Sequence, residues 1–303
     1  MDFKGILFFP VTPFGADGEV ETDLLARHVT SGVEAGAGGV FVACGTGEFH
    51  ALSADELAAC ARVAVTAVAG RVPVVAAAGG PLPLVRQQVE GLERAGVDGL
   101  LLLPPYLVNG PQQGLVDYVR EVTAATSLPV IVYQRANAVP TPDTAAELAT
   151  LPGVVGLKDG VGDVELLHRT VRRVRGARGA SAEPFHFFNG LPTAEMTVHA
   201  YRGLGISLYS SAVFAFAPEI ALAFHRAVGA GDEDTAALLL DEFYVPLVAL
   251  RNERPGYAVS LVKAGVRLRG LPVGGVRAPL LDPTPEHLDR LAKLIDHGLG
   301  VVA

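Results

Sequence analysis

The sequence predicts an α/β fold, a (β/α)8 TIM barrel followed by a C-terminal helical extension. Short apolar runs bounded by turn residues alternate with helical stretches through about the first 230 residues. About eight such strand–helix units match the size of this barrel. An open, doubly wound sheet uses fewer units and usually carries a glycine-rich turn after its first strand. Residues 10–14 read Pro-Val-Thr-Pro-Phe here, so the barrel is the better prediction.

Each expected strand is a short apolar run that ends at a turn or loop. The runs are residues 6–11, 39–44, 74–78, 99–103, 130–133, 154–158, 185–189 and 205–209. The expected helices span residues 22–35, 53–69, 84–95, 112–125, 163–175, 193–201 and 218–230, with one more that starts at residues 141–142. Ser53 and Glu56 have the spacing of a capping box and mark the start of the second helix.

The remaining residues read as helices at about 232–250, 258–268 and 285–299. We therefore divide the chain into a barrel catalytic domain, residues 1–230, and a C-terminal helical extension, residues 231–303. No flexible linker separates them, so we expect the extension to pack on the barrel.

The composition of the chain argues against several classes of function. The 303 residues are 50% hydrophobic and carry a net charge of −8, which gives no electrostatic reason to bind nucleic acid. One cluster of arginines lies on a predicted helix and its exit, where a solvated face is the favoured interpretation: Arg169, Arg172, Arg173, Arg175 and Arg178. Cys44 and Cys60 have no metal-type spacing, and no acidic cluster resembles a metal site, so we expect no metal. No signal peptide or membrane span is predicted, which favours a cytoplasmic protein with no membrane partner.

One lysine stands out because it ends a strand that should be buried on both faces. Residues 154–157 are apolar or small and lead directly into Lys158, after which Asp159 and Gly160 break the run. Cationic side chains are rarely buried without a partner. A desolvated amine is a nucleophile towards carbonyl carbon, so Lys158 is a candidate Schiff-base lysine. The alternative is a lysine whose head group reaches water at the strand end.

Other polar residues follow strand ends and should converge on the same rim. Gly45 and Thr46 offer backbone N–H groups and a hydroxyl that suit a carboxylate, although an ordinary loop explains them as well. Tyr133 is a candidate proton carrier or a barrel-lining tyrosine. Arg135 is a candidate carboxylate clamp or a partner in a surface ion pair.

Four further residues near the rim are given other interpretations. We interpret Glu48 as a buried structural acid and His50 as a structural or surface residue. Loop turning and helix capping account for Asp159 and Asp163.

In the same order along the chain, several segments resemble the dihydrodipicolinate synthase / N-acetylneuraminate lyase family. They are Cys44-Gly45-Thr46-Gly47-Glu48, Pro105-Tyr106, Val132-Tyr133 and Gly156-Leu157-Lys158-Asp159. The resemblance covers essentially the whole chain. It implies that Lys158 forms a Schiff base with an α-keto acid, that Tyr133 moves protons, and that Gly45 and Thr46 bind the keto-acid carboxylate. It also implies a homo-oligomer, commonly a tetramer.

Departures from the synthases indicate a different branch. Gly45 replaces the first of two threonines, and Leu107 replaces a second tyrosine, so the synthase's relay of tyrosine and threonine side chains cannot operate. The segments around Thr46, Tyr106, Tyr133, Lys158 and Tyr209 resemble instead the 5-dehydro-4-deoxyglucarate dehydratase branch. Gln134, Ala136 and His50 stand where Asn, Asp and Phe are expected in that branch.

The resemblance implies a decarboxylating dehydration of a sugar acid, from 5-dehydro-4-deoxy-D-glucarate to 2,5-dioxopentanoate, water and carbon dioxide. It implies neither a metal nor an organic cofactor. Arg135, Asn189 and Ser211 are the candidates that would hold the hydroxyls and the far carboxylate. The alternatives are an aldolase or synthase that uses the same lysine chemistry on another 2-keto-3-deoxy sugar acid or pyruvate, a non-catalytic keto-acid sensor, and a metal-dependent barrel lyase.

Overall fold

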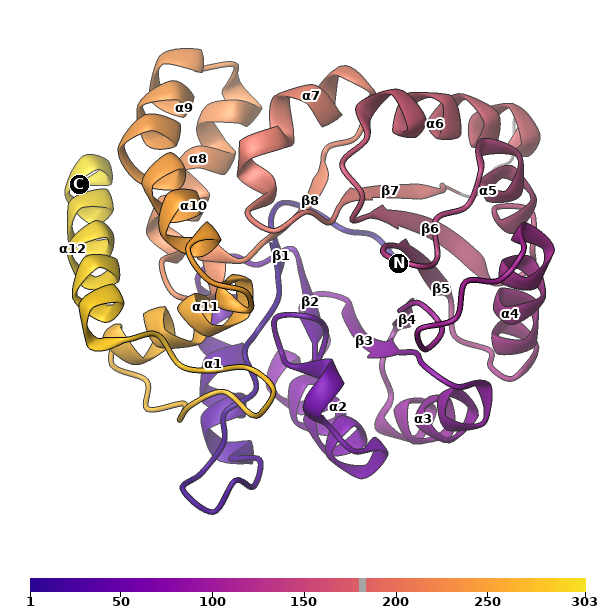
Figure 1. Cartoon of the computed structure of the whole chain (residues 1–303), viewed down its shortest axis with the longest axis horizontal. Coiled ribbons are helices and arrows are strands. Elements are labelled where there is room, and N and C mark those ends of the chain that lie inside the picture. The colour runs from indigo at the N-terminus through magenta and orange to yellow at the C-terminus, as the bar shows by residue number, and fades with distance from the viewer. Residues whose placement is uncertain (180–183) are drawn as a thin grey trace.

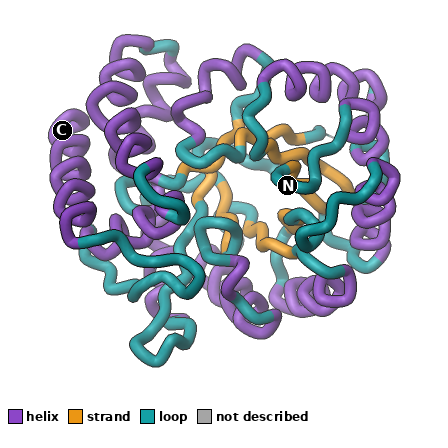
Figure 2. The backbone as a smooth tube through the Cα atoms, in the orientation of Figure 1, coloured by secondary structure: helices purple, strands orange, loops and turns teal. Residues whose placement is uncertain are grey.

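The structure, a computed structural model, describes residues 1–179 and 184–303. Within that part of the chain, parallel strands β1 to β8 pair in sequence order and β8 pairs with β1, which closes the barrel. Helices surround the ring of strands (Figures 1 and 2). The predicted (β/α)8 barrel is confirmed.

The strands are short, and most of their side chains are buried. They are β1 (Leu7–Phe8), β2 (Gly39–Val42), β3 (Val74–Ala78), β4 (Gly99–Leu102), β5 (Val130–Gln134), β6 (Val154–Asp159), β7 (His186–Asn189) and β8 (Leu208–Ser211). The helices that follow them are α1 (Thr22–Glu34), α2 (Ala54–Val68), α3 (Leu82–Ala95), α4 (Gln112–Ala124), α5 (Pro142–Leu148), α6 (Val164–Arg178), α7 (Val198–Gly203) and α8 (Pro218–Ala230).

Side-chain caps define where several helices begin. Ser53 and Glu56 form the predicted capping box of α2, with bonds of 3.1 Å from Glu56 N to Ser53 Oγ and 2.8 Å from Ser53 N to the Glu56 carboxylate. Thr141 caps α5, and Asp163 caps α6 by accepting from Leu166 N. The capping role expected for Asp163 is confirmed.

The eighth strand lies further along the chain than predicted. Residues 205–209 were expected to form it, but Gly205 has a positive φ of 76° and the strand runs from Leu208 to Ser211. Ser210 and Ser211 pair with Leu7 and Phe8 of β1, so the closure of the barrel recruits them despite their weak strand propensity.

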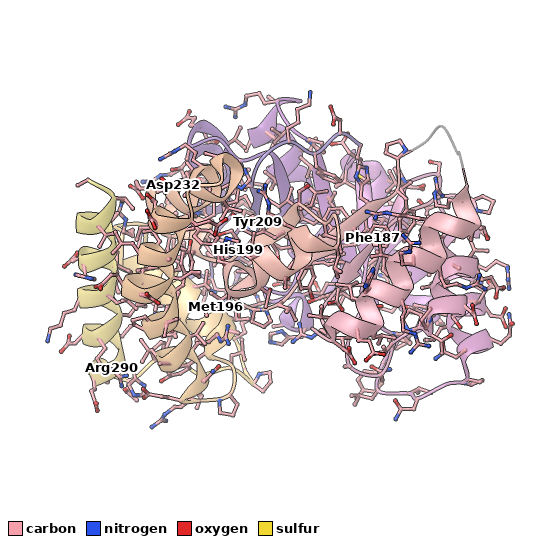
Figure 3. The ribbon with its side chains drawn as sticks, turned by 90° about the horizontal axis from the view of Figure 1, so that it is seen from above. Phe187, Met196, His199, Tyr209, Asp232 and Arg290 are labelled. Atoms are coloured by element: carbon pink, nitrogen blue, oxygen red, sulfur yellow. The ribbon has the colours of Figure 1, made fainter. Side chains whose placement is uncertain are left out.

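The C-terminal helices stack beside α8 and α1, on the opposite side of the barrel from α4 and α5 (Figure 1). They are α9 (Glu233–Leu239), a π-helical turn (Leu240–Tyr244), α10 (Val245–Asn252), α11 (Tyr257–Leu268) and α12 (Pro285–Val302). The π-helical turn interrupts the single helix expected at 232–250. Figure 3 shows Arg290 on α12, whose guanidinium donates to the Glu253 carboxylate at 2.5 and 3.0 Å. Among the described helices, none is long and apolar enough to cross a membrane.

A buried ion pair joins this extension to the loop after β2. Lys263 Nζ on α11 lies 2.7 Å from Glu48 Oε1, and both side chains are 0% exposed. Arg277 N donates to the second Glu48 oxygen at 2.8 Å. Burial lowers the pKa of Lys263, and the Glu48 carboxylate opposes that shift. Glu48 is therefore the buried structural acid that the sequence indicated.

Removing one member of this pair is expected to destabilise the fold strongly, because the other charge stays buried without a partner. We predict that Lys263→Met lowers the free energy of unfolding by roughly 3–5 kcal/mol. The exposed Lys293→Met should change it by less than about 0.5 kcal/mol. Urea unfolding measures both, and equal midpoints for the two variants would contradict this role.

Candidate active site

Lys158 and Tyr133 lie side by side on two adjacent strands. The register pairs Tyr133 of β5 with Lys158 of β6, at the end of the barrel where both strands stop. Lys158 is only 6% exposed, and its Nζ lies 4.4 Å from the ring centroids of both Tyr133 and Phe9. These distances allow cation–π contacts on two sides of the amine. The nitrogen therefore lies inside the barrel mouth and not among the surrounding helices.

Two glycines hold these side chains in a tight space. The Tyr133 hydroxyl donates to Gly190 O at 2.9 Å. A Cβ on Gly190 would lie 2.6 Å from Lys158 Cε, and a Cβ on Gly160 would lie 2.7 Å from Tyr133 Cε2. Any larger residue at either glycine would therefore displace Lys158 or Tyr133.

A cavity of about 460 Å³ opens above this pair. Its polar and basic wall groups come from Gly45, Thr46, His50, Tyr133, Arg135, Lys158 and Ser210. The rest of its wall is largely apolar: Phe9, Phe49, Leu103, Gly190, Leu191, Pro192, Ala212, Gly256, Ala258, Val259 and Leu280. Among the described residues, no aspartate or glutamate contributes to the wall, so the cavity suits an anionic ligand.

Three of the predicted binding residues line the cavity. Gly45 and Thr46 lie on the loop after β2, whereas Arg135 directly follows β5. Arg135 is exposed, and its guanidinium carbon lies 6.0 Å from the Tyr133 ring centroid. The cavity thus has a hydroxyl and backbone groups on one side and a guanidinium on another.

Asn189 and Ser211 lie outside the cavity wall, in internal hydrogen bonds. Asn189 Nδ2 donates to Ala194 O at 3.1 Å and to Thr197 Oγ1 at 2.8 Å. Ser211 Oγ donates to Glu195 Oε1 at 2.5 Å and accepts from Phe214 N. Burial raises the pKa of Glu195 to about 7, and the Ser211 hydrogen bond opposes that rise. Both side chains organise the loops behind the wall, so we do not retain them as direct ligands of a substrate.

Sequence reasoning missed several residues of the wall. Ser210, next to the predicted Ser211, lines the cavity because neighbouring strand residues face opposite sides. Both serines follow the run predicted as the eighth strand, and only Ser211 was selected as a binding residue. His50 is an exposed residue at the mouth, where no motif predicted a role for it. The extension contributes four wall residues, Gly256, Ala258, Val259 and Leu280, which no local sequence pattern indicates.

Cys44 shows how dry the interior is beside the amine. Burial raises the pKa of the Cys44 thiol to about 12, although the nearby Lys158 charge acts in the opposite direction. Cys60 is also buried, and its pKa is raised to about 12 for the same reason. Across residues 1–179 and 184–303, no group of three or more His, Cys, Asp or Glu side chains is placed to hold a metal ion.

The lysine and tyrosine on adjacent strands, the loop after β2 and the full-length match agree on one family. The sequence matches the dihydrodipicolinate synthetase family over residues 2–298. The chain belongs to that family. Its relatives include proteins from Streptomyces coelicolor and Streptomyces avermitilis, each described as "Probable 5-dehydro-4-deoxyglucarate dehydratase 1". They are 58% and 56% identical, over 99% of this chain and over 94% and 95% of their own lengths.

A solved structure of the same family has a similar fold. It is YagE, a prophage protein of E. coli K12 in complex with pyruvate, with a TM-score of 0.85 and 25% identity over 97% of this chain and 98% of that one.

Both thiols are expected to resist modification in the folded protein, because the thiolate is the reactive species and both groups are buried and protonated. We predict that a disulfide reagent at pH 8 releases no chromophore within minutes from the native protein. After unfolding in urea it should release two equivalents per chain. Rapid release of one equivalent before unfolding would contradict the dry interior beside Lys158.

Proposed function

We propose that this chain is a 5-dehydro-4-deoxyglucarate dehydratase, a lyase that releases water and carbon dioxide from its sugar-acid substrate through a Schiff base on Lys158. The observation that carries the proposal is the cross-strand pairing of Lys158 with Tyr133 at the floor of a cavity without acidic walls. The names of relatives 58% and 56% identical support the same substrate.

The reaction begins with attack of the free Lys158 amine on the ketone carbon next to a carboxylate. Loss of water then gives a protonated imine on Nζ, with the lysine nitrogen as the nucleophile that attacks the ketone carbon. Thr46 and the backbone of the Gly45 loop would hold the adjacent carboxylate, since hydroxyl and N–H donors satisfy its oxygens. That contact orients the ketone towards Lys158.

The imine then acts as the electron sink for two bond cleavages. It acidifies the neighbouring methylene, and loss of that proton gives an enamine, which expels the β-hydroxyl as water. The resulting unsaturated iminium accepts the electron pair released when the distal carboxylate leaves as carbon dioxide. Protonation and hydrolysis return the free lysine and 2,5-dioxopentanoate. Tyr133 is the proposed proton carrier, because it pairs with Lys158 on the neighbouring strand and its ring centroid lies 4.4 Å from Lys158 Nζ.

Arg135 is the proposed partner of the distal carboxylate. It lines the cavity near Tyr133, at the exposed mouth. A tightly paired, desolvated carboxylate would resist decarboxylation, whereas a solvated guanidinium positions it with a weaker charge interaction. The proposed role of Arg135 is therefore orientation of the substrate.

Trapping the imine tests the proposal directly. We predict that borohydride together with pyruvate or the sugar acid adds the reduced keto acid irreversibly to Lys158, because reduction of the imine leaves a stable amine. Peptide mass spectrometry locates the adduct. Lys158→Met should abolish labelling, and Lys293→Met should leave it unchanged. An adduct on another residue, or none, would contradict the assignment.

The products distinguish the dehydratase from its rivals. We predict one equivalent of carbon dioxide per equivalent of 5-dehydro-4-deoxy-D-glucarate, at a rate that a metal chelator does not change. An aldolase with the same lysine would instead release pyruvate from a 2-keto-3-deoxy sugar acid. Binding without any product would indicate a keto-acid sensor.

The proposal also includes a cytoplasmic location, which rests on the sequence prediction of no signal peptide or membrane span, and assembly as a homotetramer, which rests on resemblance to the family. Light scattering of the purified protein decides between one chain and four per particle.

A further inference from the structure

A second pair of residues lies directly behind the lysine and tyrosine. The β5–β6 register that pairs Tyr133 with Lys158 next pairs Gln134 with Asp159. Successive strand residues face opposite sides, so these two point away from the cavity, towards the helices. Both are 1% exposed. A buried carboxylate therefore lies one residue beyond the proposed Schiff-base lysine.

The Asp159 carboxylate is fully occupied by donors from three parts of the fold. Oδ1 accepts from Gln134 Nε2 at 2.6 Å and from Val161 N at 3.0 Å. Oδ2 accepts from Gly162 N at 3.2 Å and from the hydroxyl of Tyr201 on α7. Burying a carboxylate is costly in free energy unless such hydrogen bonds satisfy its oxygens. Four donors also fix the position and the orientation of the carboxylate group.

These bonds fix the loop that confines Tyr133. Val161 N and Gly162 N, both bound by Asp159, follow Gly160, whose own N donates to Gln134 O at 2.9 Å. Gly160 in turn leaves no space beside Tyr133, because a Cβ there would lie 2.9 Å from the phenol oxygen. The Asp159 side chain thus sets where the Tyr133 ring is held.

The Asp159 backbone fixes the other side of the pair. Its carbonyl accepts from Gly190 N at 2.7 Å, and Gly190 O accepts from the Tyr133 hydroxyl. Gly190 also leaves no room beside the lysine, since a Cβ there would lie 2.7 Å from Lys158 Cγ. Tyr133 and Lys158 therefore rest on two glycines that Asp159 holds in place.

We propose that Asp159 is a positioning residue for the reaction: its carboxylate, held by Gln134 and Tyr201, sets the distance and orientation of the Tyr133 hydroxyl relative to the imine on Lys158. This inference rests on the proposed function. The proposed role of Asp159 differs from general stabilisation of the fold. Loss of the Asp159 carboxylate should slow proton transfer at the imine more than it weakens substrate binding or folding.

The test compares Asp159→Asn and Tyr201→Phe with wild type by turnover per labelled site. The amount of protein that borohydride and pyruvate label at Lys158 counts the folded sites, so a loss of stability does not enter the rate. We expect Asp159→Asn to lower kcat per labelled site by roughly 10- to 100-fold, the range known for residues that orient the ligands of metal sites, because Asp159 orients Tyr133 and Lys158 in a comparable way. KM should change less than about threefold, because the cavity wall is intact. Tyr201→Phe removes one donor and should lower kcat by a smaller factor.

Asp98→Asn is the matched control. Asp98 Oδ2 also accepts a backbone N–H, from Val74 at the start of β3, but it lies at the opposite end of the strands from the cavity. The kcat per labelled site of the Asp98→Asn variant should equal that of wild type. Unchanged turnover per labelled site in both Asp159→Asn and Tyr201→Phe would overturn the inference while leaving Lys158 as the Schiff-base lysine. Failure of wild type to label at Lys158 would overturn the proposed function and this inference with it.

Discussion

The burial of one amine at the end of a strand is the constraint on which the site depends. Lys158 is surrounded by the rings of Phe9 and Tyr133 and by the backbone at Gly190, so its nitrogen has one position and faces one cavity. An amine held in this way presents its nitrogen to a ketone in the cavity, which is the arrangement that attack on the carbonyl carbon requires. Barrel closure supplies this environment because parallel strands bring residues 9, 133, 158 and 190 to one rim.

The mouth of the barrel is completed by residues far from the strands in sequence. The ion pair of Glu48 with Lys263 fixes the loop that carries Thr46 to helix α11 of the extension. Residues of the same extension, such as Val259 and Leu280, form part of the cavity wall. The extension therefore contributes both to the position of the carboxylate-binding loop and to the shape of the site. The division into a barrel domain, residues 1–230, and an extension, residues 231–303, stays a prediction.

Sequence patterns predicted most of the fold and the centre of the site. Alternating apolar runs located the strands, and the spacing of Ser53 and Glu56 located the start of α2. The break at Asp159 showed that Lys158 ends an otherwise apolar strand, which is an unusual place for a lysine. These signals are local, and propensity and periodicity report local structure well.

The residues that prediction missed depend on long-range contacts. The register of β8 in the closed barrel distinguishes Ser210 from Ser211, because neighbouring side chains face opposite sides of the sheet. The partners Glu48 and Lys263 are 215 residues apart, and no pattern in either segment predicts that the two side chains form an ion pair. Asp159 was explained as a turn residue, which its bonds to Val161 and Gly162 confirm, but its contact with Gln134 required the β5–β6 register.

The most direct test of the account is a crystal structure of the protein soaked with pyruvate. The account predicts continuous electron density from Lys158 Nζ to the keto carbon, with the ligand carboxylate at Gly45 and Thr46 and the Tyr133 hydroxyl beside the imine. A pyruvate molecule in the cavity with no bond to Lys158, or one bound to a different lysine, would contradict it.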